Sequence, residues 1–197
     1  MDSNDTLAFY DINAKNFIDG TLNVDFTNVQ NKFLEIISDS ALILDFGCGS
    51  GRDTKYFLER GYTVEAIDGS EELCKLASNY TGISVKHMLF QDLQEVYKYD
   101  AIWACSSILH LPYAELVDVM KKMVLALKDN GLIYTSFKYG TFEGIRNGRY
   151  FIDMTEDNLE KLLQEVDGLR IEETWITSDV RPERGEEKWL NLFLQKK

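Results

Sequence analysis

The sequence predicts a doubly wound α/β fold with a mostly parallel sheet of seven strands and N-terminal capping helices. From residue 41 onward, short apolar runs alternate with segments of helical periodicity, which is typical of βαβ units with parallel strands. The forty residues before this point have helical periodicity alone. The last two apolar runs have no helical segment between them, so we expect a C-terminal strand that pairs antiparallel.

The N-terminal segment is predicted to form two helices, because apolar residues recur at helical spacing over residues 7–18 and again over residues 26–37. We expect residues 1–39 to form a helical cap on a core made by residues 40–197. No linker or fixed-period repeat interrupts the chain, so residues 1–197 are expected to form a single domain rather than two.

Seven apolar runs are the predicted strands of the core: residues 41–46, 63–68, 83–88, 100–105, 132–137, 169–177 and 187–195. Three of the helices between them have recognisable starts. Ser70 and Thr155 are each followed by two acidic residues, as expected for N-caps, and Pro112 suits a first helical position.

Composition limits the function classes. The 197 residues include 21 Lys and Arg against 33 Asp and Glu, a formal net charge of −12, which repels nucleic-acid backbones and anionic membranes. Three cysteines and two histidines do not favour a disulfide framework or a metal site. The N-terminus carries acidic residues where a secretory signal carries basic ones. We therefore expect a cytoplasmic protein with a small ligand, no metal, and no nucleic-acid or membrane partner.

A glycine-rich loop follows the first predicted strand. Its glycines, Gly47, Gly49 and Gly51, stand at alternate positions, with Asp45 two residues ahead of the first. Glycines allow a sharp turn and a close approach of the backbone to a ligand, and ligands of open α/β sheets bind at such strand ends. The alternative reading is a purely structural turn between strand and helix.

The spacing of this loop disfavours a dinucleotide. A dinucleotide-binding loop has the pattern G-x-G-x-x-G, but here the third glycine position is Arg52 or Thr54, depending on the starting glycine. Asp68 ends the second predicted strand, where an acid can accept hydrogen bonds from ribose hydroxyls. Taken alone Asp68 could equally be a solvated strand end; together with the loop it predicts a nucleoside ligand.

Four motifs in order give the chain a family resemblance. They are ILDFGCGSGRDT (43–54), AIDGS (66–70), FQDL (90–93) and SSILHLP (106–112). This series resembles class I S-adenosylmethionine-dependent methyltransferases, which have a Rossmann-like fold, and in particular the small single-domain enzymes often labelled tellurite-resistance-like. The resemblance runs from about Tyr10 to the C-terminus. It implies S-adenosylmethionine as methyl donor and S-adenosylhomocysteine as product.

The resemblance also implies which residues bind the donor. Gly47, Cys48, Gly49 and Gly51 would line the methionine moiety, with Asp45 nearby. Asp68 and Gly69 would bind the ribose, Asp92 the adenine amino group, and Leu93 would lie beside it. Cys105, at the end of the fourth strand, would lie near the sulfonium, and Tyr10 would reach the donor carboxylate. Both cysteines can instead be small packing residues.

Candidate acceptor-side residues lie in two places. His110, after the fourth strand, is a candidate general base, with a packed loop histidine as the alternative. The segment 138–153, expected to be a loop, carries Tyr139, Arg146, Arg149 and Tyr150. Its two arginines could grip an anionic acceptor, or could neutralise neighbouring acids.

The predicted reaction is in-line methyl transfer to a small-molecule acceptor. The chain lacks the Pro-Pro-aromatic run by which amino-methylating DNA enzymes of this fold hold a flipped base. Two alternatives stay open at this point. One is a nicotinamide-dependent oxidoreductase on a related sheet, which the missing third glycine argues against. The other is a non-catalytic protein that binds S-adenosylmethionine.

Overall fold

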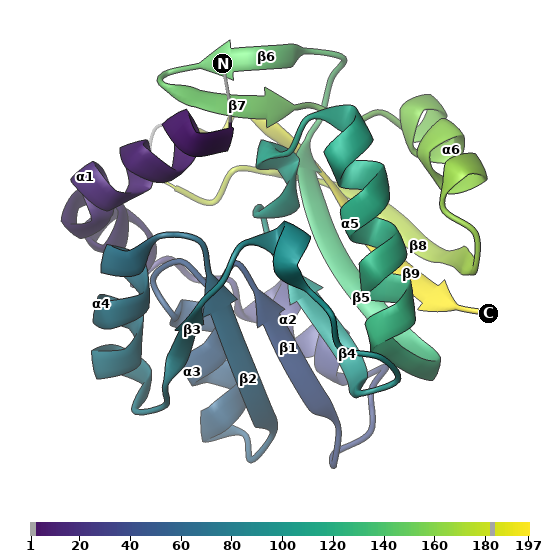
Figure 1. Ribbon diagram of the computed structural model, residues 1–197, viewed down its shortest axis with the longest axis horizontal. Coiled ribbons are helices and arrows are strands. Elements are labelled where there is room, and N and C mark those ends of the chain that lie inside the picture. The colour runs from purple at the N-terminus through teal and green to yellow at the C-terminus, as the bar shows by residue number, and fades with distance from the viewer. Residues whose placement is uncertain (1–2, 182–183) are drawn as a thin grey trace.

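The computed structural model describes residues 3–181 and 184–197. The strands of the main sheet are β1 (Leu42–Phe46), β2 (Thr63–Asp68), β3 (Val85–His87), β4 (Tyr99–Ala104), β5 (Leu127–Lys138), β8 (Leu169–Ser178) and β9 (Lys188–Lys196). Their order across the sheet is β3-β2-β1-β4-β5-β9-β8 (Figure 1). Strands β1 to β5 pair parallel, and β9 pairs antiparallel with both β5 and β8. The predicted fold class and the antiparallel C-terminal strand are therefore confirmed.

Within the described residues, six α-helices and two short 3₁₀ helices surround this sheet. They are α1 (Ser3–Thr21), α2 (Thr27–Leu34), α3 (Arg52–Glu59), α4 (Glu71–Thr81), α5 (Tyr113–Ala126), α6 (Glu156–Glu165), η1 (Phe90–Asp92) and η2 (Ile108–His110). Ser70 and Thr155 are the N-caps of α4 and α6, as predicted, and each accepts a hydrogen bond from a backbone N–H of the first turn. Pro112 is the N-cap of α5 rather than its first residue, so the helix begins one residue later than predicted.

The two faces of the sheet bury different side chains, because successive residues of a strand point to opposite sides. Leu44 and Ile102 belong to the cluster that contains the apolar faces of α5 and α6. Their neighbours Ile43 and Trp103 belong to the cluster that contains Phe33 of α2 and Phe57 of α3. The sheet therefore has helices on both faces, the arrangement of a doubly wound fold (Figure 1).

The segment 138–153 differs from the prediction. It is not a loop but a hairpin of β6 (Glu143–Arg146) and β7 (Arg149–Ile152), which lies beside α1 above the carboxyl ends of the parallel strands (Figure 1). The turn consists of Asn147 and Gly148, with φ of 52° and 76°. Positive φ at both central residues is what a two-residue turn needs to match the twist of the paired strands.

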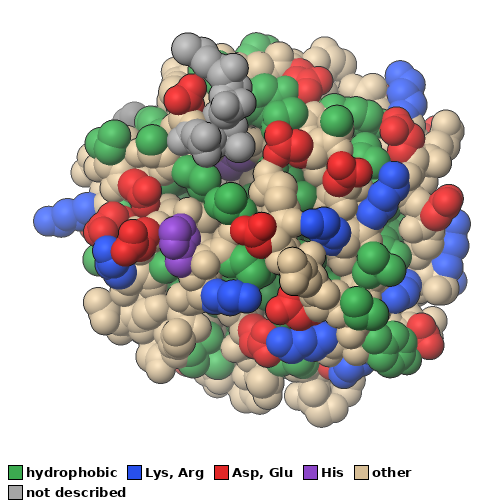
Figure 2. Space-filling view, in the orientation of Figure 1, with side chains coloured by type: hydrophobic (Ala, Val, Ile, Leu, Met, Phe, Trp, Pro, Cys, Tyr) green, Lys and Arg blue, Asp and Glu red, His purple; other side chains and the backbone are tan. Residues whose placement is uncertain are grey.

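The strand order reverses between β1 and β4, so the carboxyl ends of these two neighbours diverge into separate loops. In open α/β sheets this is where a crevice forms and ligands bind. On the face seen in Figure 2, acidic and basic side chains are interspersed rather than segregated. None of the helices in the described residues is long and apolar enough to cross a bilayer.

Candidate active site

A cavity of about 220 Å³ opens at the carboxyl ends of β1, β2, β4 and β5, beneath α1 and the β6–β7 hairpin. Nine of the predicted site residues line it: Tyr10, Gly47, Cys48, Gly49, Asp68, Gly69, Cys105, His110 and Arg149. Seven do not: Asp45, Gly51, Asp92, Leu93, Tyr139, Arg146 and Tyr150. The structure thus brings residues from five separate segments of the sequence around one space.

The glycine loop lies directly against the cavity at Gly47 and Gly49. Both residues have positive φ, at 87° and 54°. A Cβ on Gly47 would lie 2.6 Å from the Cβ of Ser107, and a Cβ on Gly49 would lie 2.9 Å from the ring of Phe17. Side chains are therefore excluded at both positions by backbone conformation and by space. The cavity floor here is bare backbone, which a ligand can approach closely.

Gly51 has a different role from the other two glycines. It is the N-cap of α3 with φ of 78°, and a Cβ there would lie 2.8 Å from Cγ2 of Thr81 and 3.2 Å from Cβ of Ala77. Thr81 and Ala77 belong to α4, so Gly51 allows α3 and α4 to pack closely. The structure places it at a helix contact, away from the cavity.

Asp68 is 9% exposed and forms part of the cavity wall at the end of β2. Its two carboxylate oxygens each accept one backbone hydrogen bond, from Gly49 N at 2.8 Å and from Ser70 N at 2.9 Å. Burial raises the pKa of Asp68, and these hydrogen bonds oppose that rise. Since a carboxylate can accept about four hydrogen bonds, acceptor capacity is left for a ligand with hydroxyl groups.

Asp45 lies below the glycine loop, where it accepts a 2.5 Å hydrogen bond from Oγ1 of Thr54 in α3. Burial and the neighbouring charge of Asp53 raise the pKa of Asp45 to about 8. Asp53 itself binds the Arg52 guanidinium through both oxygens and accepts a hydrogen bond from Nε1 of Trp103. Burial disfavours the charged form of Asp53, but these partners outweigh it and lower its pKa. The two acids therefore anchor the start of α3 to the sheet.

The segment after β3 presents other residues to the cavity than the sequence predicts. Asp92 is exposed at the end of η1, and Leu93 is buried in the core. The residues of this segment that line the cavity are Leu89, Phe90 and Gln91. The 3₁₀ turn rotates Asp92 outward, so its contact with an adenine group stays a prediction.

A chain of hydrogen bonds joins α1, η2 and β7 across the cavity. Nη1 of Arg149 lies 3.1 Å from the hydroxyl oxygen of Tyr10, which lies 2.8 Å from Nε2 of His110. Nδ1 of His110 lies 2.6 Å from the carbonyl oxygen of Tyr150. A guanidinium only donates and a carbonyl only accepts, so every proton is assigned. Arg149 donates to Tyr10, Tyr10 donates to His110, and His110 donates from Nδ1 to the carbonyl.

Burial lowers the pKa of His110 to about 4, with the charge of Arg149 acting in the same direction and the hydrogen bond to Tyr150 opposing it. At neutral pH His110 is therefore a neutral imidazole, and its Nε2 lone pair accepts the Tyr10 proton. A direct general-base role would require Tyr10 to move away first. In this arrangement His110 orients Tyr10.

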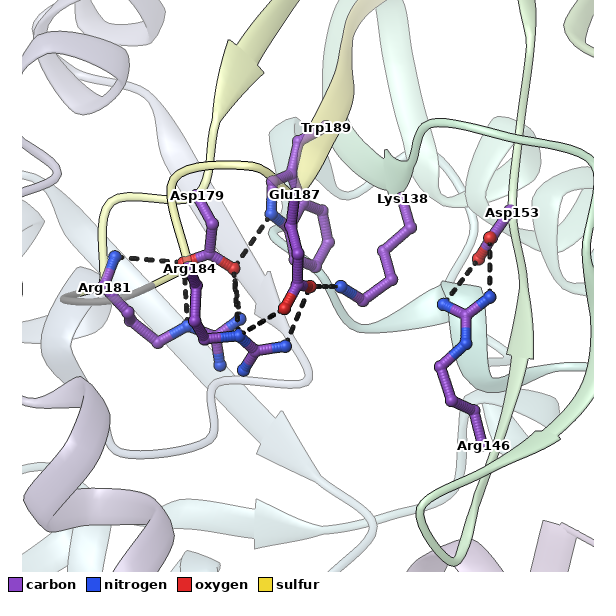
Figure 3. A network of polar contacts seen from close by, with 8 residues as sticks. All are labelled: Lys138, Arg146, Asp153, Asp179, Arg181, Arg184, Glu187 and Trp189. Carbon is purple, nitrogen blue, oxygen red and sulfur yellow. Dashed lines mark hydrogen bonds and ion pairs between the residues drawn. The ribbon is translucent and has the colours of Figure 1, made fainter.

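Ion pairs line the wall next to β5 and β9 (Figure 3). Arg181 binds Asp179 through Nε at 2.9 Å, Arg184 binds Glu187 through Nε at 2.6 Å, and Glu187 also pairs with Lys138. Burial alone would raise the pKa of Asp179, but its hydrogen bonds with Arg181 lower it to about 2. Each of these cations in the cavity wall is therefore paired with a carboxylate.

The remaining predicted acceptor residues point elsewhere. Arg146 binds Asp153 through two nitrogens, at 3.3 and 2.8 Å, and this pair lies apart from the other six residues of Figure 3. The hydroxyls of Tyr139 and Tyr150 donate to Glu156 and Glu143 at exposed positions. The hairpin places Arg146 directly opposite Arg149, but Arg146 pairs with Asp153 whereas Arg149 lines the cavity and donates to Tyr10.

Sequence reasoning did not single out several residues of the cavity wall: Phe17, Thr21, Lys138, Asp179 and Trp189. Lys138 ends β5, so its place after a strand was an available signal. Asp179 and Trp189 flank the connection between β8 and β9, and only the antiparallel pairing of these strands with β5 brings them to the site. The described residues contain no group of three or more His, Cys, Asp or Glu side chains arranged for a metal ion.

Comparison with known proteins gives consistent matches. Residues 43–131 match the family model of a methyltransferase domain. The chain is 26% identical over 140 residues to an uncharacterized methyltransferase of Staphylococcus carnosus, covering 67% of this chain and 68% of that protein. It is 36% identical over 98 residues to the N-terminal Xaa-Pro-Lys N-methyltransferase 1 of Xenopus tropicalis, covering 46% of this chain and 44% of the Xenopus enzyme.

Among solved structures, the fold is similar to the 1,6-didemethyltoxoflavin-N1-methyltransferase of Burkholderia thailandensis, solved with 1,6-didemethyltoxoflavin and S-adenosylhomocysteine bound. The TM-score is 0.75 at 21% identity, covering 98% of this chain and 86% of that chain. The matched domain, the sheet order and the glycine loop together indicate a methyltransferase domain. This chain therefore carries a methyltransferase domain at residues 43–131, and as a whole it shares the fold of the Burkholderia enzyme.

Proposed function

We propose that the protein transfers the methyl group of S-adenosylmethionine to a small-molecule acceptor held in the same cavity as the donor. The observation that carries this proposal is the extent of that cavity. The same cavity is lined by the glycine loop and by Lys138, Arg149 and Trp189. One space lined by both groups of residues suits a donor and an acceptor that bind next to each other.

The donor fits the glycine-loop end. Gly47 and Gly49 offer bare backbone to the methionine moiety, and Asp68 keeps acceptor capacity for the ribose hydroxyls. Gly69 lies beside Asp68, where a Cβ would come within 2.6 Å of Leu7. Cys48 and Cys105 are small side chains on the same wall. Asp92 and Leu93 would join this site only if the segment after β3 rearranges.

The donor, when bound, supplies a methyl group on a sulfonium that departs as a neutral thioether. The protein then has to align the acceptor and exclude water, and α1 closes over the cavity with Leu7, Tyr10 and Phe17 for this purpose. His110 would accept a proton from an acceptor only by way of Tyr10. An acceptor with a free lone pair needs no base at all.

The charges of the cavity favour an anionic or neutral acceptor over a cationic one. Among the described lining residues, five are cationic and three are carboxylates: Arg52, Lys138, Arg149, Arg181 and Arg184 against Asp53, Asp68 and Asp179. The donor adds a further positive charge at its sulfonium. A cationic acceptor would therefore meet repulsion from both the wall and the donor.

Incubation with methyl-labelled donor tests this proposal. The purified protein is mixed with S-adenosylmethionine carrying a deuterated methyl group and with either the small-molecule or the protein fraction of a cell extract. Mass spectrometry is then expected to find the label among the small molecules, and none with a Gly49→Val variant. Label found only in the protein fraction would contradict the proposal, an outcome made relevant by the similarity to a protein N-terminal methyltransferase.

A further inference from the structure

Arg149 differs from the other cations of the cavity wall. Arg52, Lys138, Arg181 and Arg184 each have a carboxylate within 4 Å. Arg149 lines the same cavity, and none of the described residues places a carboxylate within that distance of it. A partly buried guanidinium without an anionic partner loses solvation and gains no ion pair. Such an arrangement is stabilised when a ligand supplies the anion.

The unoccupied edge of the guanidinium can be identified. Nη1 donates to Tyr10, whereas Nε is buried and has no hydrogen-bond partner among the described residues. Nη2 likewise makes no hydrogen bond to any side chain or backbone atom that the structure describes. Nε and Nη2 form one edge of the planar guanidinium. Two parallel N–H donors on such an edge match the two oxygens of a carboxylate.

The surroundings hold this edge in place. The guanidinium carbon lies 4.8 Å from the ring centre of Phe9 and 5.1 Å from that of Phe151. The chain from Arg149 through Tyr10 and His110 to a backbone carbonyl fixes the opposite side. Aromatic walls lower the local polarity and strengthen a charge-assisted hydrogen bond. The site is therefore arranged before a ligand arrives.

We propose that Arg149 binds a carboxylate of the methyl acceptor through its Nε and Nη2 edge, so that the substrates of this enzyme are carboxylic acids. This inference rests on the proposed function. The donor also carries a carboxylate, but its proposed site is the glycine loop, where Phe17 packs on Gly49. Arg149 packs on Phe9 and donates to Tyr10, whose ring in turn packs on Phe17, so the donor carboxylate is the competing ligand that the experiment distinguishes.

Nuclear magnetic resonance of nitrogen-15-labelled protein tests the proposal through the Nε–H signals of arginines. The Arg149 signal is assigned by its loss in Arg149→Lys. Acetate serves as the probe, because it is a carboxylate small enough for any pocket that holds a larger one, and acetamide is its neutral control. The signal of Arg170, an exposed arginine that pairs with Glu172, is the internal control.

In protein saturated with S-adenosylhomocysteine, acetate is expected to shift the Arg149 signal in a saturable way, while acetamide leaves it unchanged and the Arg170 signal does not move. Arg149→Lys, which keeps the charge but not the two-donor edge, is expected to weaken acetate binding about tenfold, measured on the backbone amide of Tyr150.

Two results would overturn the proposal. In the first, S-adenosylhomocysteine itself shifts the Arg149 signal, whereas 5′-methylthioadenosine, which has no carboxylate, does not shift it. If acetate then has no further effect, Arg149 binds the carboxylate of the donor. In the second, neither S-adenosylhomocysteine nor acetate moves the Arg149 signal. Failure of the proposed function looks different, because S-adenosylhomocysteine would then leave every signal of the protein unchanged.

Discussion

Replacement of Gly51 by alanine tests whether this glycine is needed for helix packing or for ligand binding. The substitution Gly51→Ala forces a non-glycine residue to keep φ at 78°, which costs about 1–2 kcal/mol in the left-handed region. The new Cβ would also lie 2.8 Å from Thr81, and overpacking of this kind costs about 1–3 kcal/mol. Together the free energy of unfolding should fall by about 2–5 kcal/mol.

The assay is urea denaturation, with Gly61→Ala as the matched control. Gly61 also has φ of 87°, but a Cβ there meets nothing within 4 Å, so only the conformational cost applies. The difference between the two variants isolates the contact with α4. A second substitution, Thr81→Ser, removes the methyl group nearest to the added Cβ, and we expect it to recover much of that difference in the Gly51→Ala background.

The affinity of Gly51→Ala for S-adenosylhomocysteine is the measurement that can refute this reasoning. Because Gly51 does not line the cavity, folded Gly51→Ala should bind S-adenosylhomocysteine within about threefold of the wild-type affinity, a change of less than 1 kcal/mol. The reasoning is refuted if Gly51→Ala is no less stable than Gly61→Ala and yet binds the donor product tenfold or more weakly. Gly51 would then act as the family resemblance implies.

Three further predictions concern acids and the histidine of the site. Asp68→Asn should weaken S-adenosylhomocysteine binding about tenfold or more by calorimetry, since hydrogen bonds to a charged group are worth about 1.5–3 kcal/mol, whereas exposed Asp118→Asn should not. Asp53→Ala should lower the unfolding free energy by about 3–5 kcal/mol, because it leaves the Arg52 guanidinium without its partner; Glu71→Ala, in an exposed pair, should cost under about 1 kcal/mol. His110 has a pKa of about 4 in the folded protein, against an ordinary value near 6.5. The stability that this difference contributes is complete above about pH 6.5 and is lost as the pH falls toward 4. Between pH 7.5 and 5 this loss is about 2 kcal/mol, and His110→Gln should remove it.

Each of these predictions has a result that contradicts it. Equal losses in Asp68→Asn and Asp118→Asn would mean that Asp68 does not contact the ligand. A stable Asp53→Ala would mean that water solvates Arg52 in place of the carboxylate. An unchanged pH dependence in His110→Gln would mean that other groups titrate over that range.

The central sheet could be predicted from the sequence because its strands are buried on both faces. Residues 41–46 are apolar except for Asp45, and such a run is typical of a strand in a covered parallel sheet. The glycine loop and Asp68 could be predicted because they lie within a few residues of strand ends. Their local spacing alone determines that they reach one edge of the sheet.

The acceptor end could not be predicted in the same way. The β6–β7 hairpin had a local signal, the Asn147-Gly148 pair, but its position over the cavity depends on contacts with α1 and η2. Arg146 and Arg149 lie opposite each other in the hairpin and differ in their partners, because Arg146 pairs with Asp153 and Arg149 donates to Tyr10. Sequence spacing does not show which of several nearby cations an acid will neutralise.

Helix α1 contributes residues to both proposed ligand sites, and this couples the binding free energies of the two ligands. Phe17 and Leu7 pack where the donor is proposed to lie, and Tyr10 holds Arg149. Asp11 and Thr6 fasten the same helix to α4 and to β7. Because both ligands are proposed to contact this one helix, the binding of donor and acceptor should be energetically coupled. By thermodynamic linkage, each changes the affinity of the other by the same factor.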